Sequence, residues 1–415
     1  MARAGSSRTR NTLLVAGVPL VATALISCAD AEVPAAGGCA PIETRAPNGA
    51  RQRPAFAGQT RACAVRSDAE FEVVVLGKGL DKPWAVEPLP DGDLLVTEKP
   101  GRMRIVTAKG ETLAPIEGVP PVDARGQGGL LDVALSPEFA TDQTVYWSYS
   151  EPRRGGNATS VARGVLSADR ARLADVRVIF RALPVYDGDK HYGSRLAFGP
   201  DGMLYVTLGE RSDKSMRPQA QQLDSHMGKI VRVAPDGAVP PDNPYAGRAG
   251  ALKEIWSLGH RNVQAAAFDP QGRLWEVEHG ARGGDELNLV GRGKNYGWGE
   301  VAYGIEYSGQ PISGAVTARE GTEQPVYYWD PVIAPSGMQF YTGDAFPAWR
   351  GSVFIGGMKA TGLVRLTLEG TKVTGEEHLL TDRGQRIRDV RQGPDGALYV
   401  VTDATNGELW KIAPR

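Results

Sequence analysis

Short apolar runs with alternating polar positions recur along the chain, and a turn of Pro-Asp-Gly type precedes most of them. Pro-Asp-Gly stands at residues 90–92, 200–202 and 394–396, and looser copies stand at 137–139 and 270–272. Proline presets the first corner dihedral and glycine accepts a positive φ, so each copy predicts a hairpin corner that leads into a half-buried strand.

A strand-and-turn unit that recurs at intervals of tens of residues is typical of a β-propeller. Another strand-like run, Val-Phe-Ile-Gly-Gly at 353–357, fills the long gap before the last turn. Spread over residues 67–415, the recurrence gives about 58 residues per unit for six units. We therefore predict an all-β fold, a six-bladed β-propeller of four-stranded antiparallel blades. Seven blades and a two-sheet sandwich are the alternatives, although a sandwich does not require such a recurrence.

The composition agrees with a turn-rich β protein. The 415 residues include 52 Gly and 29 Pro, and 41% are hydrophobic, which is too many for a disordered chain. The formal net charge of −1 argues against a nucleic-acid partner. The chain has no P-loop, no HExxH and no CxxC, and its Gly-x-Gly segments lack the third glycine of a dinucleotide motif. Nucleotide, nicotinamide and zinc chemistry therefore lose support.

The N-terminus has the pattern of an export signal. Arg3, Arg8 and Arg10 precede an uncharged run over residues 11–27, which is short for a membrane-spanning helix. We predict a signal peptide over 1–27. The sequence Leu-Ile-Ser-Cys at 25–28 resembles a lipoprotein cleavage box and favours a lipid anchor at Cys28, so the protein would be periplasmic or tethered to a membrane surface. The alternative is an ordinary signal peptide.

Residues 28–66 are rich in Ala, Pro, Gly and Arg and have no apolar period. This composition predicts a disordered linker ahead of the propeller at 67–415. Cys39 and Cys63 fall in this segment, and in an exported chain they form a candidate disulfide. The alternative is two unpaired thiols.

Three polar segments could carry chemistry. His191 lies in a polar loop ahead of a predicted strand, and Glu210 follows that strand, which suits a general base and the carboxylate that orients it. The glycine-rich turn at 278–286 offers carbonyls and carboxylates to a hard cation such as Ca²⁺. Arg386 and Arg388 share one face of an extended segment and could bind an anion. The alternatives are a surface histidine, an acidic turn and surface ion pairs.

Six ordered segments, at residues 126–132, 191–196, 259–262, 278–288, 293–298 and 386–388, resemble the soluble glucose and aldose sugar dehydrogenases. That family consists of six-bladed propellers that use pyrroloquinoline quinone (PQQ) and calcium. The resemblance covers roughly residues 70–413 and is closest to the bacterial aldose sugar dehydrogenase branch.

The resemblance implies roles for individual residues. It implies that His191 is the catalytic base with Glu210 as its partner, and that Arg261 stabilises the charge that develops on the cofactor. The remaining implied PQQ contacts are Gln127, Asn262, Tyr307, Lys359, Arg386 and Arg388. The carbonyls of Gly280 and Ala281 match those that hold the cofactor calcium, and Glu286 with the carbonyl of Tyr296 matches a second calcium site. Ala281 stands where the glucose dehydrogenase branch has proline, and Glu210 replaces a shorter aspartate.

The implied activity is oxidation of an aldose sugar at C1 to a lactone, with a His-assisted hydride transfer to calcium-bound PQQ. Electrons would then pass to an external acceptor, since the chain has no haem-attachment motif. The expected assembly is a monomer or a dimer. The alternatives are a calcium-dependent hydrolase such as a lactonase, which would not need four cations around a planar tricarboxylate, and a non-catalytic binding propeller.

Overall fold

The computed structural model describes residues 38–415, and all structural statements below concern that part of the chain. The predicted signal peptide and Cys28 lie outside the described residues, so both stay predictions. Among the helices of the described part, none has the length and apolar character needed to cross a bilayer.

Strands are the main regular secondary structure of the described chain. In chain order they are β1 (Phe71–Leu80), β2 (Pro83–Pro88), β3 (Leu94–Glu98), β4 (Arg102–Val106), β5 (Leu130–Leu135), β6 (Thr144–Arg153), β7 (Gly156–Leu166), β8 (Leu173–Arg181), β9 (Leu196–Phe198), β10 (Leu204–Thr207), β11 (Lys229–Val233), β12 (Ile255–Leu258), β13 (Val263–Phe268), β14 (Leu274–Glu278), β15 (Asp285–Leu289), β16 (Tyr327–Trp329), β17 (Pro335–Phe340), β18 (Val353–Gly357), β19 (Gly362–Glu369), β20 (Lys372–Leu379), β21 (Ile387–Gln392), β22 (Leu398–Thr402) and β23 (Gly407–Pro414). The helical pieces are short: α1 (Phe139–Asp142), η1 (Arg217–Gln221), η2 (Ser313–Ala315), η3 (Pro347–Trp349) and η4 (Thr381–Arg383).

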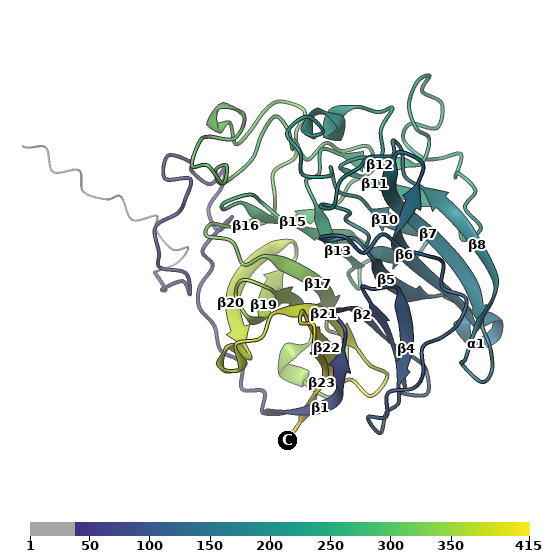
Figure 1. The fold of residues 1–415 in the computed structure, drawn as a ribbon. Helices are drawn as coiled ribbons and strands as arrows, with labels where there is room; N and C mark the ends of the chain where they lie inside the picture. Colours follow the sequence, from purple (N-terminus) through teal and green to yellow (C-terminus); the bar gives the residue numbers. More distant parts are fainter. Residues whose placement is uncertain (1–37) are drawn as a thin grey trace, which may run out of the picture. The chain divides into compact units, whose positions relative to one another are not determined.

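The strands form six antiparallel sheets arranged around one axis, which confirms the predicted six-bladed β-propeller (Figure 1). The sheets are β2-β3-β4, β5-β6-β7-β8, β9-β10-β11-β12, β13-β14-β15-β16, β17-β18-β19-β20 and β21-β22-β23-β1. The last of these pairs β1 with β23, so the two ends of the propeller close the ring within one sheet. The prediction of four strands per blade holds for five sheets, whereas the sheet that starts at β2 has three.

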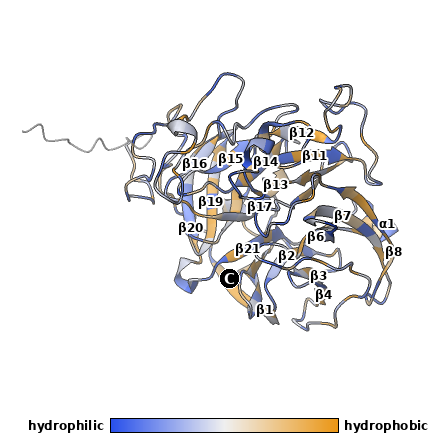
Figure 2. Cartoon of the chain, turned by 45° about the horizontal axis from the view of Figure 1, so that its top comes forward, coloured by the Kyte–Doolittle hydropathy of each residue, from blue (hydrophilic) through white to orange (hydrophobic). Residues whose placement is uncertain are grey.

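The innermost strands β2, β5, β9, β13, β17 and β21 contact one another in a ring around the axis. Apolar side chains pack between successive blades, as in the cluster of Trp84, Leu131 and Trp147. Figure 2 shows hydrophobic residues recurring along the strands of the blades. The Pro-Asp-Gly turns connect an innermost strand to the next one: Gly202 has φ 73° and donates its N–H to the carbonyl of Gly199. The turn chemistry that predicted the blades therefore forms their corners.

The predicted disordered linker is wrong for residues 38–66. Cys39 and Cys63 are joined by a disulfide, as hypothesised, and Gln59 is fully buried with its amide bonded to the carbonyl of Pro325. The segment runs beside β16 and β20, in purple at the left of Figure 1. It lacks a periodic pattern because side chains, rather than a long strand ladder, hold it in place.

Candidate active site

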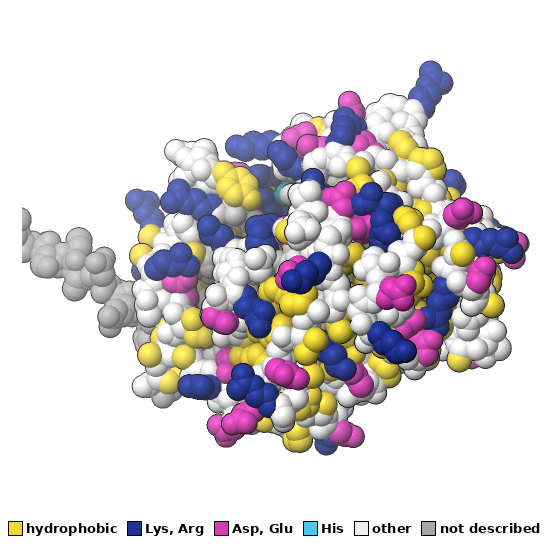
Figure 3. Space-filling view, turned by 60° about the horizontal axis from the view of Figure 1, so that its bottom comes forward, with side chains coloured by type: hydrophobic (Ala, Val, Ile, Leu, Met, Phe, Trp, Pro, Cys, Tyr) yellow, Lys and Arg dark blue, Asp and Glu magenta, His cyan; other side chains and the backbone are white. Residues whose placement is uncertain are grey.

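A cavity of about 530 Å³ lies on the axis at the end where the innermost strands begin. Each blade contributes to its wall through an innermost strand or the loop that leads into it: Trp84, Leu131, Ser194, Gln264, Ala334 and Arg388. Figure 3 shows a hollow around which Lys and Arg side chains gather. The scattered motifs of the sequence thus converge on one place, as a propeller requires.

His191 and Glu210 form a buried pair beside this cavity. The His191 Nδ1 atom lies 2.6 Å from the Glu210 carboxylate, and the two side chains are 6% and 1% exposed. Burial lowers the pKa of His191, against the opposing effect of Glu210, and the imidazole in turn keeps the pKa of Glu210 below its ordinary value despite burial. Because Glu210 engages Nδ1, Nε2 is the ring nitrogen that can accept a proton. The pair has the electrostatics of a general base with its orienting carboxylate.

The loop that carries His191 is fixed by neighbouring blades. The His191 N–H donates to Gln127 Oε1 at 2.8 Å, and the Gly193 N–H donates to Asn262 Oδ1 at 3.1 Å. A Cβ on Gly209 would lie 2.3 Å from the His191 carbonyl oxygen, so only glycine fits there. Gln127 and Asn262, both predicted as cofactor contacts, therefore contact the loop of the candidate general base, His191.

Arg261 lies in the adjacent blade and is 5% exposed. Its guanidinium donates to the carbonyls of Gly280 at 2.7 Å and His279 at 3.0 Å. The Arg261 carbonyl accepts the Glu210 N–H at 3.0 Å, which links it to the base. Within residues 38–415 its buried Nε has no hydrogen-bond partner. The guanidinium therefore retains an unmet donor, which suits an anionic or carbonyl oxygen of a ligand.

Arg386 and Arg388 both line the cavity, as their predicted role requires. One carboxylate, Asp403, holds the two of them: Arg386 donates to Oδ2 at 2.7 Å and Arg388 to Oδ1 at 3.1 Å. Lys99 lines the same wall, and burial together with the nearby Arg388 lowers its pKa to about 8. The wall carries more positive than negative charge and is suited to a carboxylated ligand.

Two of the predicted cofactor contacts, Lys359 and Tyr307, do not line the cavity. Lys359 is exposed and follows Met358, which lines the cavity. Tyr307 is 71% exposed, and no described contact brings it to the other predicted residues. The structure thus gathers Gln127, Arg386 and Arg388 at the cavity but leaves Tyr307 outside it.

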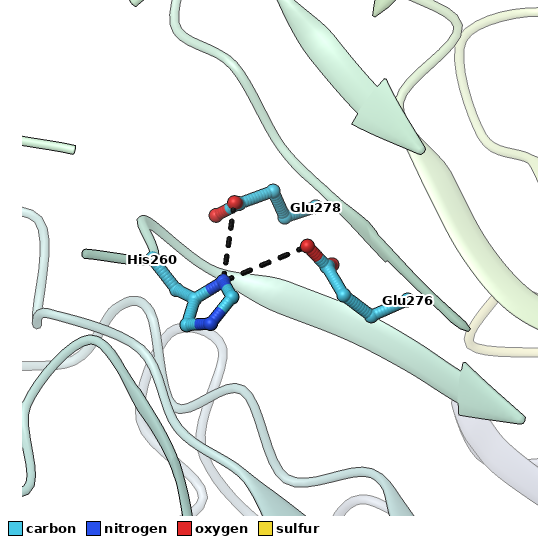
Figure 4. A group of neighbouring side chains, drawn as sticks. All are labelled: His260, Glu276 and Glu278. Atoms are coloured by element: carbon cyan, nitrogen blue, oxygen red, sulfur yellow. Dashed lines mark hydrogen bonds and ion pairs between the residues drawn. The ribbon is translucent and has the colours of Figure 1, made fainter. Parts of the chain in front are cut away.

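A second cluster lies next to Arg261 in the chain and consists of His260, in the loop between β12 and β13, with glutamates of β14 and β15. His260 approaches Glu276 at 3.6 Å and Glu278 at 3.4 Å, and all three are buried (Figure 4). Burial opposes the charging of His260, but the hydrogen bonds that its ring donates to the carboxylates of Glu276 and Glu278 prevail and raise its pKa to about 9. Burial and the neighbouring Glu278 raise the pKa of Glu276 to about 7 and that of Glu286 well above its ordinary value.

This cluster fits a cation. A cavity of about 10 Å³, large enough for one small ion or water, is lined by Gly280, Glu278, Glu286 and Tyr296. Glu276 Oε2 and Asn288 Oδ1 are buried acceptors without a partner in the described part of the chain. Glu276, Glu278 and Glu286 place three buried carboxyl groups near two cationic groups, His260 and Arg261, and a bound cation would stabilise the ionised carboxylates. Gly280 and Ala281 belong to the adjoining turn, where Arg261 already occupies the Gly280 carbonyl.

Several lining residues carry no sequence signal that could have found them: Trp84, Lys99, Gln264 and Asp403. Asp403 lies on the β22–β23 hairpin, and only the pairing of β21 with β22 brings it to Arg386 and Arg388. His279 lay in a recognised motif, and its role as a lining residue follows from its position after β14. Burial lowers the pKa of His279 to about 3, so the ring is neutral.

The described chain is thus a six-bladed β-propeller with a buried histidine–glutamate pair beside an axial cavity lined by cationic side chains. A family model described as Glucose / Sorbosone dehydrogenase matches residues 80–411, and the chain belongs to that family.

Individual relatives agree with this membership. The chain is 48% identical over 353 residues to aldose sugar dehydrogenase YliI of Escherichia coli, covering 84% of this chain and 94% of the relative. A crystal structure of a glucose dehydrogenase matches with a TM-score of 0.81 and 50% identity, over 83% of this chain and all of the other. The PQQ-bound aldose sugar dehydrogenase from Streptomyces coelicolor matches with a TM-score of 0.68 and 32% identity, over 84% of this chain and 100% of that one.

Proposed function

We propose that this protein is a PQQ- and calcium-dependent dehydrogenase that oxidises aldose sugars at C1 to lactones. The observation that carries the proposal is the buried His191–Glu210 pair beside a cavity whose wall presents Arg386 and Arg388. A base at one side and paired guanidiniums at another suit a hydroxyl substrate together with a carboxylated cofactor. The PQQ-bound relative supports the choice of cofactor.

Each residue of the site has a separate role in the proposed reaction. Glu210 accepts the Nδ1–H of His191 and fixes the ring, so that Nε2 can take the proton from the anomeric hydroxyl of the sugar. Arg386 and Arg388, held by Asp403, bind carboxylates of the cofactor, and the unmet donor of Arg261 stabilises negative charge that develops beside it. Gln127 and Asn262 fix the position of the loop that carries His191 by accepting its backbone N–H groups.

When bound, PQQ supplies the quinone that takes up the hydride from the sugar, and calcium supplies Lewis-acid polarisation. The carbonyls of Gly280 and Ala281 would hold the cofactor calcium. Glu286 and the carbonyl of Tyr296 would hold a second ion, beside the unmet acceptors of Glu276 and Asn288. A cation at the Gly280 carbonyl would share that oxygen with Arg261, which its second lone pair allows.

Reconstitution tests the proposal. The apo-protein is mixed with PQQ and Ca²⁺, separately and together, and aldose-dependent reduction of an artificial dye is measured. We expect turnover only when both are present, with an external acceptor consuming the electrons. Absence of turnover together with no retained PQQ absorbance would contradict the proposal.

A pair of arginine variants locates the cofactor. Arg386→Ala removes a guanidinium from the cavity wall and should weaken PQQ loading by about tenfold or more, because charge-assisted bonds to carboxylates are lost. Arg383→Ala is the matched control, since Arg383 lies over the Trp410 ring and outside the cavity lining. Equal PQQ titration curves for both variants would exclude Arg386 as a carboxylate contact.

A further inference from the structure

The segment of residues 38–66, here called the strap, lies outside the region matched by the family model, which begins at residue 80. Its two ends are joined by the Cys39–Cys63 disulfide and by a hydrogen bond from the Ala64 N–H to the Ala40 carbonyl at 2.9 Å. The strap is therefore a closed loop rather than an extended leader.

The strap is fastened to the outer strand β16. The Tyr328 N–H donates to the Gln59 carbonyl at 2.9 Å, and the Ala62 N–H donates to the Tyr327 hydroxyl at 2.8 Å. Gln59 is fully buried, and its Oε1 accepts the Tyr303 hydroxyl at 3.0 Å. These contacts fix the strap beside the blade that carries the 280–284 turn (Figure 1).

One carboxylate, Asp330, joins the strap to that turn. The backbone N–H groups of Asn48 and Gly49 donate to its two oxygens at 2.9 and 2.8 Å, and the Asn48 side-chain amide adds a third bond at 2.7 Å. On its other side the carboxylate lies against Gly283, where a Cβ would be 2.3 Å from Oδ1. Asp330 is 5% exposed, so the strap supplies most of the donors that this buried carboxylate needs.

Two strap side chains reach the turn and its backing loop. Asn48 Oδ1 accepts from Arg282 Nε at 3.0 Å, within the turn itself. Gln52 brackets Gly304, accepting its N–H at 2.7 Å and donating to its carbonyl at 3.1 Å. Gly304 in turn packs against the Gly283 carbonyl, and Arg282 and Ile305 exchange backbone hydrogen bonds of 2.9 Å.

We propose that the strap is a positioning element for the 280–284 turn and that it sets the affinity of this turn for calcium. The part concerning calcium rests on the proposed function, in which the carbonyls of Gly280 and Ala281 are ligands. Apart from Arg282, the turn consists of glycine and alanine, whose side chains form no hydrogen bonds of their own, so the contacts with Asp330, Asn48 and Gln52 help to fix its backbone. Loss of a residue that orients the ligands of a metal typically lowers the metal affinity by about 10–100-fold.

Hydrogen exchange of the full-length apo-protein tests the positioning without any metal or cofactor. Asn48→Ala and the double variant Cys39→Ser with Cys63→Ser are compared with wild type. We expect faster exchange in peptides that cover 280–284 and 302–305, and unchanged exchange in β6 and β7. Arg45→Ala is the control, because within residues 38–415 the Arg45 side chain bonds only to Glu43. Unchanged exchange at 280–284 while the strap itself exchanges faster would overturn the proposal.

Calcium titration of the same apo-proteins tests the consequence. Wild type should bind calcium in two steps, and Asn48→Ala should weaken one step by about 10–100-fold while leaving the other unchanged. Equal affinities in wild type and Asn48→Ala would overturn the link to calcium. If wild type binds no calcium and the variants still loosen the turn, the positioning stands and the metal assignment of the proposed function fails. Treating wild type with dithiothreitol should reproduce the double-cysteine variant.

Discussion

His191 adopts a backbone conformation that few non-glycine residues accept, with φ 48°, and Ser194 in the same loop has φ 99°. Such conformations cost on the order of 1–3 kcal/mol each and persist where surrounding contacts determine them. Here the Gln127 side chain holds the His191 N–H and Glu210 holds the ring. The strained backbone of His191 is therefore held in place by Gln127, and the position of its ring is set by Glu210.

Removal of the imidazole should separate catalysis from cofactor binding. His191→Ala is expected to lower kcat by about 10²–10⁴-fold, the usual contribution of a general base, while PQQ still binds. His378→Ala is the matched control, because His378 pairs with Glu376 on β20, outside the cavity lining. Steady-state kinetics at a saturating sugar concentration gives kcat for both variants. Turnover of His191→Ala near that of wild type would exclude His191 as the base.

The pH profile follows from the lowered pKa of His191. The base works when neutral, so kcat/KM should fall as the pH drops through a pKa below the ordinary value of about 6.5. Glu210 is the group that favours the imidazolium form, and Glu210→Gln removes its charge. The acid limb of the variant should therefore lie at lower pH than that of wild type. A limb that moves to higher pH would contradict the assigned pair.

At the scale of elements, the loop after β10 must approach the His191 loop without a side chain. Gly209→Ala would place a Cβ 2.3 Å from the His191 carbonyl oxygen and should destabilise the fold by about 1–3 kcal/mol, as overpacked sites do. It should also lower kcat, because the base is displaced. Gly247→Ala is the control, since nothing lies within 4 Å of its Cβ and its φ is not positive. Urea unfolding measures both variants, and equal midpoints would show that the loops can move apart.

The sequence could predict those elements whose turns are specified by neighbouring residues in the chain. The corners at Gly92, Gly202 and Gly396 each need a positive φ, and each carries its signal within three residues. The linker that the sequence predicts for the strap is wrong because the partners of the strap, such as Asp330 for Asn48, lie hundreds of residues away. Asp403 cannot be found from the sequence for the same reason, whereas His191 and Glu210 flank the β9–β10 hairpin, 19 residues apart, and could be paired.

At the scale of the whole molecule, a buried ion cluster ties the blades together below the cavity. The Arg195 guanidinium lies 2.6 Å from Asp132 Oδ1 on β5 and 3.1 Å from Asp389 Oδ1 on β21. It also donates to the Gln264 carbonyl on β13 at 3.2 Å and lies 4.6 Å from the centre of the Trp84 ring on β2. Arg195 itself precedes β9, so one side chain connects the inner strands of five blades. The ring therefore depends on charge pairing at its centre as well as on apolar packing between blades.

Arg195→Ala tests this dependence, because it leaves Asp132 and Asp389 buried with less compensating charge. Removing one partner of a buried pair costs about 3–5 kcal/mol, so we expect a loss of that size in the free energy of unfolding. Arg350→Ala removes an exposed ion pair with Asp344 and should cost about 0–1 kcal/mol. Adding Asp132→Asn to Arg195→Ala should recover part of the loss if uncompensated charge causes it. A double variant no more stable than Arg195→Ala would instead assign the cost to the cavity left behind, and the blades would then be joined by packing alone.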